Sequence, residues 1–154
     1  TPSFYNNNLQ IIQNRDHLVI ITEMVHDARI VPLNDSPPAP REIGFWTGDS
    51  RGYWEGDTLV VETQNFNGLT NTFSLLGSSE NKHLTEKFTR VARDQINYEF
   101  TVDDPSTFTD KIVGLIPIYK VAGQVYEYAC HEGNYGMINI LRGARVGEQS
   151  TESN

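Results

Sequence analysis

The chain has little of what marks a disulfide-bonded, nucleic-acid-binding or membrane-spanning protein. Its 154 residues include a single cysteine, Cys130, which excludes an internal disulfide and a cysteine-based zinc site. Only 12 basic residues stand against 20 acidic ones, and the net charge of −8 argues against nucleic acid and anionic membranes as partners. No apolar run approaches the ~20 residues of a membrane-spanning helix. The phosphate-binding glycine loop, the Gly-x-Ser-x-Gly elbow and the His-Glu-x-x-His motif are also missing.

Hydrophobic residues are scarce as well, at 38% of the chain, although seven Phe, seven Tyr and two Trp are present. A chain of this length forms one domain by the usual size rule and can bury a core. We therefore expect a single domain whose modest core is rich in aromatic side chains.

Three short turn segments separate runs of apolar and β-branched residues, and each predicts a β-hairpin. The clearest turn contains Gly56-Asp57, because Gly and Asp tolerate the positive φ angles of tight hairpins. The predicted turns are residues 14–16, 55–57 and 92–95.

The strand after the third turn alternates regularly, with Ile96, Tyr98, Phe100 and Val102 on one face. Aromatic residues on strands with aliphatic neighbours are expected inside. We therefore predict that the side chains of Trp54, Phe88, Tyr98 and Phe100 are mostly buried.

Between these hairpins the sequence is less regular. Residues 34–40 contain three prolines in four positions, so they form a loop rather than part of a sheet interior. The other predicted elements are an extended run at 28–33, a long loop at 67–81, a long or broken strand at 107–121, a last strand at 125–130 and a short helix or strand at 135–141.

About eight strands joined mostly by hairpins predict a mainly β fold with little helix, built as a single antiparallel meander. We expect this sheet to close into a small lipocalin-like barrel or to fold into a sandwich. The predicted organisation is an N-terminal arm at 1–8, a β domain at 9–145 and a flexible C-terminal tail at 146–154. Charged residues on otherwise apolar strands indicate either a polar interior or solvent-facing sides: Glu62, Glu86, Glu99 and Glu127.

Histidines at strand ends are the main candidates for chemistry. His26 precedes Asp27, and His131 lies between Cys130 and Glu132, so either histidine can serve as a general base. The alternatives are a surface histidine at His26 and a small buried hydrophobe at Cys130. Glu80 and His83 can reach the same centre, but the spacing matches no known metal signature, and we predict neither a metal nor a cofactor.

Several strings resemble a widespread, uncharacterised family of exported bacterial proteins. They include GDSRGYWEGDTLVVET at 48–63 and YEYACHEGN at 126–134, and the resemblance covers roughly residues 9–145. Members of that family usually carry a signal peptide and a further N-terminal stretch. The resemblance implies a periplasmic or secreted setting, and it assigns no catalytic role to any residue.

Three functions are consistent with these features. The first is an exported β-barrel domain that binds a small organic ligand. The second is an acid/base enzyme (lyase, isomerase or hydrolase) on the same barrel. The third is a structural subunit that self-associates, with the polar arm at 1–8 as a candidate contact.

We expect the site at one end of the barrel, where Arg51, Glu55, His26, Glu127 and His131 converge. The candidate catalytic residues are His26, Glu55 and His131. The candidate ligand-binding residues are Arg51, Trp54, Glu80, Tyr98, Glu99, Glu127 and Tyr128.

Overall fold

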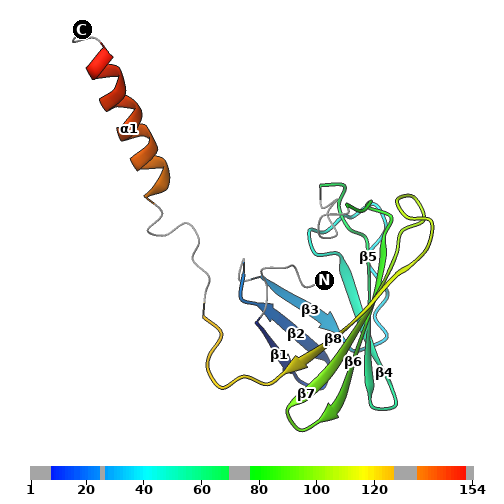
Figure 1. Cartoon of the computed structure of the whole chain (residues 1–154). Coiled ribbons are helices and arrows are strands. Elements are labelled where there is room, and N and C mark those ends of the chain that lie inside the picture. Colours follow the sequence, from blue (N-terminus) through cyan, green and yellow to red (C-terminus); the bar gives the residue numbers. More distant parts are fainter. Residues whose placement is uncertain (1–7, 25–26, 70–76, 127–134, 152–154) are drawn as a thin grey trace.

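The structure is a computed structural model that describes residues 8–24, 27–69, 77–126 and 135–151. It is mainly β, with two antiparallel sheets (Figure 1). The smaller sheet has the order β1-β2-β3 and the larger one the order β4-β5-β6-β7-β8. The smaller sheet contains β1 (Leu9–Gln13), β2 (His17–Thr22) and β3 (Ala28–Pro32). The larger sheet contains β4 (Asp49–Glu55), β5 (Thr58–Gln64), β6 (His83–Ala92), β7 (Gln95–Asp103) and β8 (Ile112–Tyr119).

All three predicted hairpins are confirmed. In the first turn the Asn14 side-chain oxygen accepts hydrogen bonds from the backbone N–H groups of Asp16 at 2.9 Å and His17 at 2.7 Å. In the second turn Gly56 has a φ of +60°, the left-handed geometry that selects glycine. The third hairpin has an irregular register between Arg90 and Ala92, near its turn.

The hydrophobic core lies between the two sheets. The small sheet contributes Leu18, Ile20 and Val31, and the large sheet contributes Leu59, Val61, Phe88 and Tyr98. The Phe88 and Tyr98 rings lie 4.9 Å apart between centroids, within the range of favourable aromatic contacts. Phe88 and Tyr98 are the aromatic members of a cluster that is otherwise aliphatic, so the prediction of an aromatic-rich core is wrong.

A glycine permits the close approach of the sheets at β4. A Cβ on Gly52 would lie 2.7 Å from Leu33 Cδ2 and 3.0 Å from Val31 Cγ1. A side chain at Gly52 would therefore push β4 away from the chain at β3.

The predicted parity of β7 is confirmed, since Tyr98 and Val102 are buried while Glu99 is exposed. Phe88 is also buried as predicted, and Phe100 is partly buried against the core. The prediction for Trp54 is wrong, because its side chain is 50% exposed. Trp54 is the penultimate residue of β4, beside the turn that joins β4 to β5, and it is not part of the core cluster.

The predicted antiparallel meander is confirmed within each sheet, but the strands form two sheets rather than one. The strand order breaks between β3 and β4, and the described residues do not form a closed barrel. β3 ends at Pro32, and the proline-rich segment that follows is held by side chains of β4. Arg51 donates to the carbonyls of Ser36 and Pro37, and the Asp49 carboxylate accepts from the backbone N–H of Ala39 at 2.7 Å.

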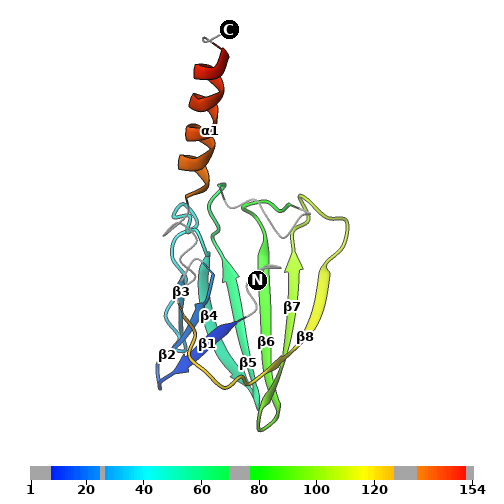
Figure 2. The same cartoon turned by 60° about the vertical axis from the view of Figure 1, so that its left-hand side comes forward.

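The C-terminal element is a helix, α1 (Gly136–Thr151), and it is longer than the predicted short helix. It includes residues 146–151, for which the sequence predicted a polar tail. Figures 1 and 2 both show α1 apart from the two sheets. Residues 125 and 126 of the predicted last strand at 125–130 are not in a strand, and its remaining residues lie outside the described ranges. Residues 1–7 of the predicted arm at 1–8 also lie outside them. In the described parts of the chain, no helix has the length and apolar character needed to cross a bilayer.

Candidate ligand-binding site at the seam between the sheets

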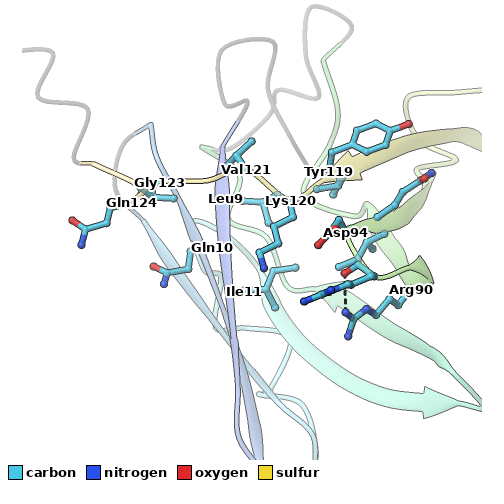
Figure 3. Close-up of a pocket in the computed structure, with 15 residues that line it drawn as sticks. Leu9, Gln10, Ile11, Arg90, Asp94, Tyr119, Lys120, Val121, Gly123 and Gln124 are labelled. Carbon is cyan, nitrogen blue, oxygen red and sulfur yellow. Dashed lines mark hydrogen bonds between the residues drawn. The ribbon is translucent and has the colours of Figure 1, made fainter.

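An open pocket of about 750 Å³ lies where the edge strand β1 faces the far end of the large sheet. We call it the seam pocket. Figure 3 shows Leu9, Gln10 and Ile11 of β1 on one side and Arg90 and Asp94 on the other. The end of β8 and the chain after it complete the wall, with lining residues at 119–121 and 123–125. A pocket of this size suits a small organic ligand.

The floor of the seam pocket is apolar. Ile11, Ile96 and Ile118 line it and also pack, partly buried, against the core cluster. Ile96 of β7 is the cross-strand partner of Ile118 on β8 and of Arg90 on β6. The side chains of Ile96, Ile118 and Arg90 therefore lie on the same inner face of the large sheet. The hydrophobic face of the sheet therefore continues into the pocket.

The rim of the seam pocket is basic. It carries Arg90, Arg93 and Lys120, whereas Asp94 is the single carboxylate among its lining residues. Arg90 donates to the carbonyls of Ala92 at 3.3 Å and Arg93 at 2.7 Å, which fixes the hairpin turn. Within the described ranges the side chains of Arg93 and Lys120 form no ion pair. This concentration of positive charge is notable because the chain has a net charge of −8.

A buried charged cluster lies on the inner faces of both sheets. Arg29 of β3 contacts Glu86 of β6, with 2.6 Å between Nη1 and Oε2, and their side chains are 15% and 3% exposed. The Tyr98 hydroxyl donates to the other Glu86 oxygen at 2.8 Å. This cluster therefore adds a charged connection between the sheets to the hydrophobic one.

The protonation of this cluster follows from its surroundings. Burial alone raises the pKa of the Glu86 carboxyl, but the positive charge of Arg29 and the hydrogen bond from Tyr98 outweigh burial, so the pKa lies below its usual range. Burial, together with the charge of Glu86, raises the pKa of the Tyr98 hydroxyl. Glu86 is therefore a carboxylate and Tyr98 a neutral donor across the ordinary pH range.

Arg29 and Glu86 are absent from the site residues predicted from the sequence. The signal for Glu86 was its position between Leu84 and Phe88, which puts it on the buried face of β6. No comparable signal identified Arg29, because its contact with Glu86 depends on how the two sheets pack.

The structure does not bring the predicted site residues together. Arg51 and Glu55 lie four positions apart on β4, about 13 Å along an extended strand. Arg51 pairs with Asp49, and Glu55 lies 3.6 Å from the Lys87 ammonium. Arg51 therefore anchors a loop, and Glu55 forms an exposed ion pair.

The other predicted residues have separate environments. Trp54 and Glu99 are exposed, Tyr98 is in the core, and Glu80 lines a different pocket that is described below. His26, Glu127, Tyr128 and His131 lie outside the described residues, as do Cys130 and Glu132. No group of three or more His, Cys, Asp or Glu side chains in the described ranges is arranged to hold a metal ion.

No protein-family model matches the sequence, and the searches of curated proteins and of solved structures gave no significant match. The functional interpretation therefore depends on the chemistry of the site itself.

Proposed function

We propose that this chain binds a small organic ligand that has an apolar body and an anionic group. In this proposal the two sheets are the walls of an incomplete barrel, and the ligand enters at the seam between β1 and β8. The observation that carries the proposal is the composition of the seam pocket. Its floor continues the hydrophobic core, and its rim has three cationic side chains against one carboxylate.

Charge complementarity supports an anionic ligand. On a chain of net charge −8, most of the surface repels an anion, so a local excess of cations selects where it can bind. Arginine also matches a carboxylate or a similar planar anion in geometry, since its guanidinium can donate two parallel hydrogen bonds. Arg93 and Lys120 are the favoured partners, because Arg90 already donates to two turn carbonyls.

The composition of the seam pocket favours binding over acid/base catalysis. Its lining contains no histidine among the described residues, and its carboxylate, Asp94, is exposed. An acid/base mechanism needs a positioned group whose pKa lies near the working pH. An exported setting remains a prediction that depends on the resemblance of the sequence motifs alone.

Isothermal titration calorimetry with decanoate, octanoate and decanol tests this function. We expect decanoate to bind more tightly than decanol, which lacks the charge. Decanoate should also bind about 15-fold more tightly than octanoate, because two buried methylenes contribute about 1.6 kcal/mol. Equal affinity for decanoate and decanol would contradict the role assigned to the basic rim.

Charge-removing variants locate the anion-binding groups. We expect R93Q and K120Q each to weaken decanoate binding about tenfold, as for the loss of a hydrogen bond to a charged group. The control is K111Q, which removes the same charge from an exposed lysine that pairs with Asp103 at 2.9 Å, outside the pocket. A loss of affinity in K111Q as large as that in R93Q would show that net charge, and not the pocket, controls binding.

A further inference from the structure

A second pocket, of about 560 Å³, lies at the end of the large sheet where β5 ends and β6 begins. We call it the loop pocket. Its walls come from residues 41, 42 and 44 before β4, residues 64–68 at the end of β5 and residues 80–83 at the start of β6. None of these residues lines the seam pocket, so the two pockets are separate.

Backbone hydrogen bonds fix one wall of the loop pocket. Phe45 donates to the Asn65 carbonyl and accepts from the Asn67 N–H, both at 2.9 Å. Asn65 has a φ of +57°, a left-handed conformation that Asn adopts more readily than most residues. Its side-chain amide donates to the Ala39 carbonyl at 2.8 Å, which ties this wall to the proline-rich loop.

A buried aspartate fixes the opposite wall. Asp104 accepts hydrogen bonds from the Ser79 backbone N–H, from the Ser79 hydroxyl at 2.8 Å and from the Ser106 hydroxyl at 2.7 Å. The Ser79 hydroxyl oxygen in turn accepts from the Asn81 N–H at 3.1 Å. The turn that presents Glu80 and Asn81 to the pocket is therefore held before any ligand arrives.

The charges in the loop pocket balance, in contrast to those in the seam pocket. Its lining contains two basic side chains, Arg41 and Lys82, and two carboxylates, Glu42 and Glu80, so their formal charges sum to zero. The Lys82 ammonium is also engaged by the protein, since it donates to the Ser78 hydroxyl at 3.0 Å and lies 4.3 Å from the centroid of the Phe66 ring. His83 also lines the pocket, and with histidine counted as neutral, as in the net charge of the chain, the pocket has no excess charge to attract an ion.

The other polar groups supply both donors and acceptors. Side-chain amides of Gln64, Asn65, Asn67 and Asn81 line the pocket. An amide has both a carbonyl acceptor and N–H donors. The protein already uses the Asn65 amide N–H group, which donates to Ala39, and the Asn67 oxygen, which accepts from the Leu69 N–H at 3.1 Å. The groups that face a ligand are therefore mainly those of Gln64 and Asn81, and the carboxylate of Glu80 adds further acceptors. A ligand can form hydrogen bonds with all of these side chains if its own groups both donate and accept. A hydroxyl group does both.

We propose that the loop pocket is a second binding site, which takes a neutral polyhydroxylated ligand of the sugar class. Burial of so many polar groups is favourable only if the ligand supplies hydrogen-bond partners for them, which excludes an apolar ligand. The balanced charge gives no advantage to an ion. This site is independent of ligand binding in the seam pocket.

The test is a titration of the ¹⁵N-labelled chain, followed by amide chemical shifts, with a panel of methyl glucoside, methyl galactoside and methyl mannoside. Glucuronate and glucosamine serve as charged counterparts. We expect at least one neutral glycoside to give saturable shifts at residues 65–68 and 80–83. The proposal is overturned if none of the three does so, or if a charged sugar saturates the same resonances at lower concentration.

Two variants test the role of Glu80. Replacement of the carboxylate in E80Q should weaken glycoside binding about tenfold, as for the loss of a hydrogen bond to a charged group. Gly68→Ala moves the carboxylate without removing it, because the new Cβ would lie 2.7 Å from Glu80 Oε2, and it should also weaken binding. The control is E99Q, the same change at an exposed position on β7.

Unchanged glycoside binding in both E80Q and Gly68→Ala would overturn the proposal, as would an equal loss in E99Q. The decanoate affinity of E80Q should equal that of the unmodified chain. This comparison separates a failure of the loop pocket from a failure of the seam pocket.

Discussion

Removal of the buried carboxylate in Glu86→Ala should be among the most destabilising single changes in this protein. The change leaves the Arg29 guanidinium, whose side chain is 15% exposed, without its partner at 2.6 Å. It also leaves the Tyr98 hydroxyl without its acceptor. Loss of one partner of a buried ion pair costs about 3–5 kcal/mol, because the remaining charge is still buried. That cost is a large share of the ~5–15 kcal/mol that stabilises a typical domain.

Urea unfolding followed by circular dichroism measures this cost. The matched control is Glu55→Ala, which breaks an exposed pair with 3.6 Å between the carboxylate and the Lys87 ammonium. Exposed pairs contribute about 0–1 kcal/mol, so this control should be nearly neutral. A cost below about 1 kcal/mol for Glu86→Ala, in the range of surface substitutions, would refute the assignment of the Arg29–Glu86 contact as a buried connection.

A double variant separates the charge from the volume. Arg29→Met combined with Glu86→Leu replaces both charges with apolar groups of similar size. Such replacements are often neutral or stabilising, so the double variant should be more stable than Glu86→Ala alone. If the double variant loses as much stability as Glu86→Ala, the unpaired Arg29 charge is not the source of the cost, which then lies with the Tyr98 hydroxyl that lacks its acceptor in both variants.

The same pair makes stability depend on pH in a defined direction. The pKa of Glu86 is lower in the folded chain than in the unfolded chain, where it is near the ordinary value of about 4.3. The folded state therefore gains stability from this carboxylate above the unfolded pKa and loses it as the pH falls through the folded pKa. Below pH 5 the unfolding free energy of the unmodified chain should fall more steeply than that of the Arg29→Met, Glu86→Leu double variant.

Three further substitutions follow from packing and hydrogen bonding. Gly114→Ala should cost about 1–3 kcal/mol in urea unfolding, since its Cβ would clash with the Phe100 ring, and a neutral result would show that the ring can move aside. Asp104→Asn should cost about 1.5–3 kcal/mol in urea unfolding, because the amide forms weaker hydrogen bonds with Ser79 than the carboxylate does. In the unmodified chain those bonds outweigh burial and hold the pKa of Asp104 well below its usual range, so the unfolding free energy of the variant should fall less in acid. Trp54→Ala should cost less than about 1 kcal/mol, because half of the side chain is exposed, and a loss typical of core tryptophans of about 3–5 kcal/mol would contradict its placement.

Local features of the fold could be predicted from the sequence because they depend on neighbouring residues. The Gly56-Asp57 turn and the alternation from Ile96 to Val102 determine two hairpins and the inward face of β7. A similar alternation on β6, between Leu84 and Phe88, places Glu86 inside the protein. The sequence pattern alone does not say whether such a carboxylate is paired, since its partner comes from another sheet.

Features that depend on packing between the sheets could not be predicted in this way. The seam pocket combines Ile11, near the start of the chain, with Ile118 and Lys120, and no local period links these positions. The exposure of Trp54 likewise depends on where the small sheet stops covering the large one. Arg51 was expected in the binding site, but it pairs with Asp49 on the same strand, and the pair anchors a loop.

The position of bound decanoate tests the central claim most directly. Amide chemical shifts of the ¹⁵N-labelled chain should move on addition of decanoate at residues 9–11, 93–96 and 118–121, the walls of the seam pocket. They should move little at residues 65–68 and 80–83 of the loop pocket. Saturable shifts confined to the seam pocket, and weakened in R93Q, are the predicted result. Shifts elsewhere on the chain, or none at saturating decanoate, would contradict the proposal that the seam between the sheets is a ligand-binding site.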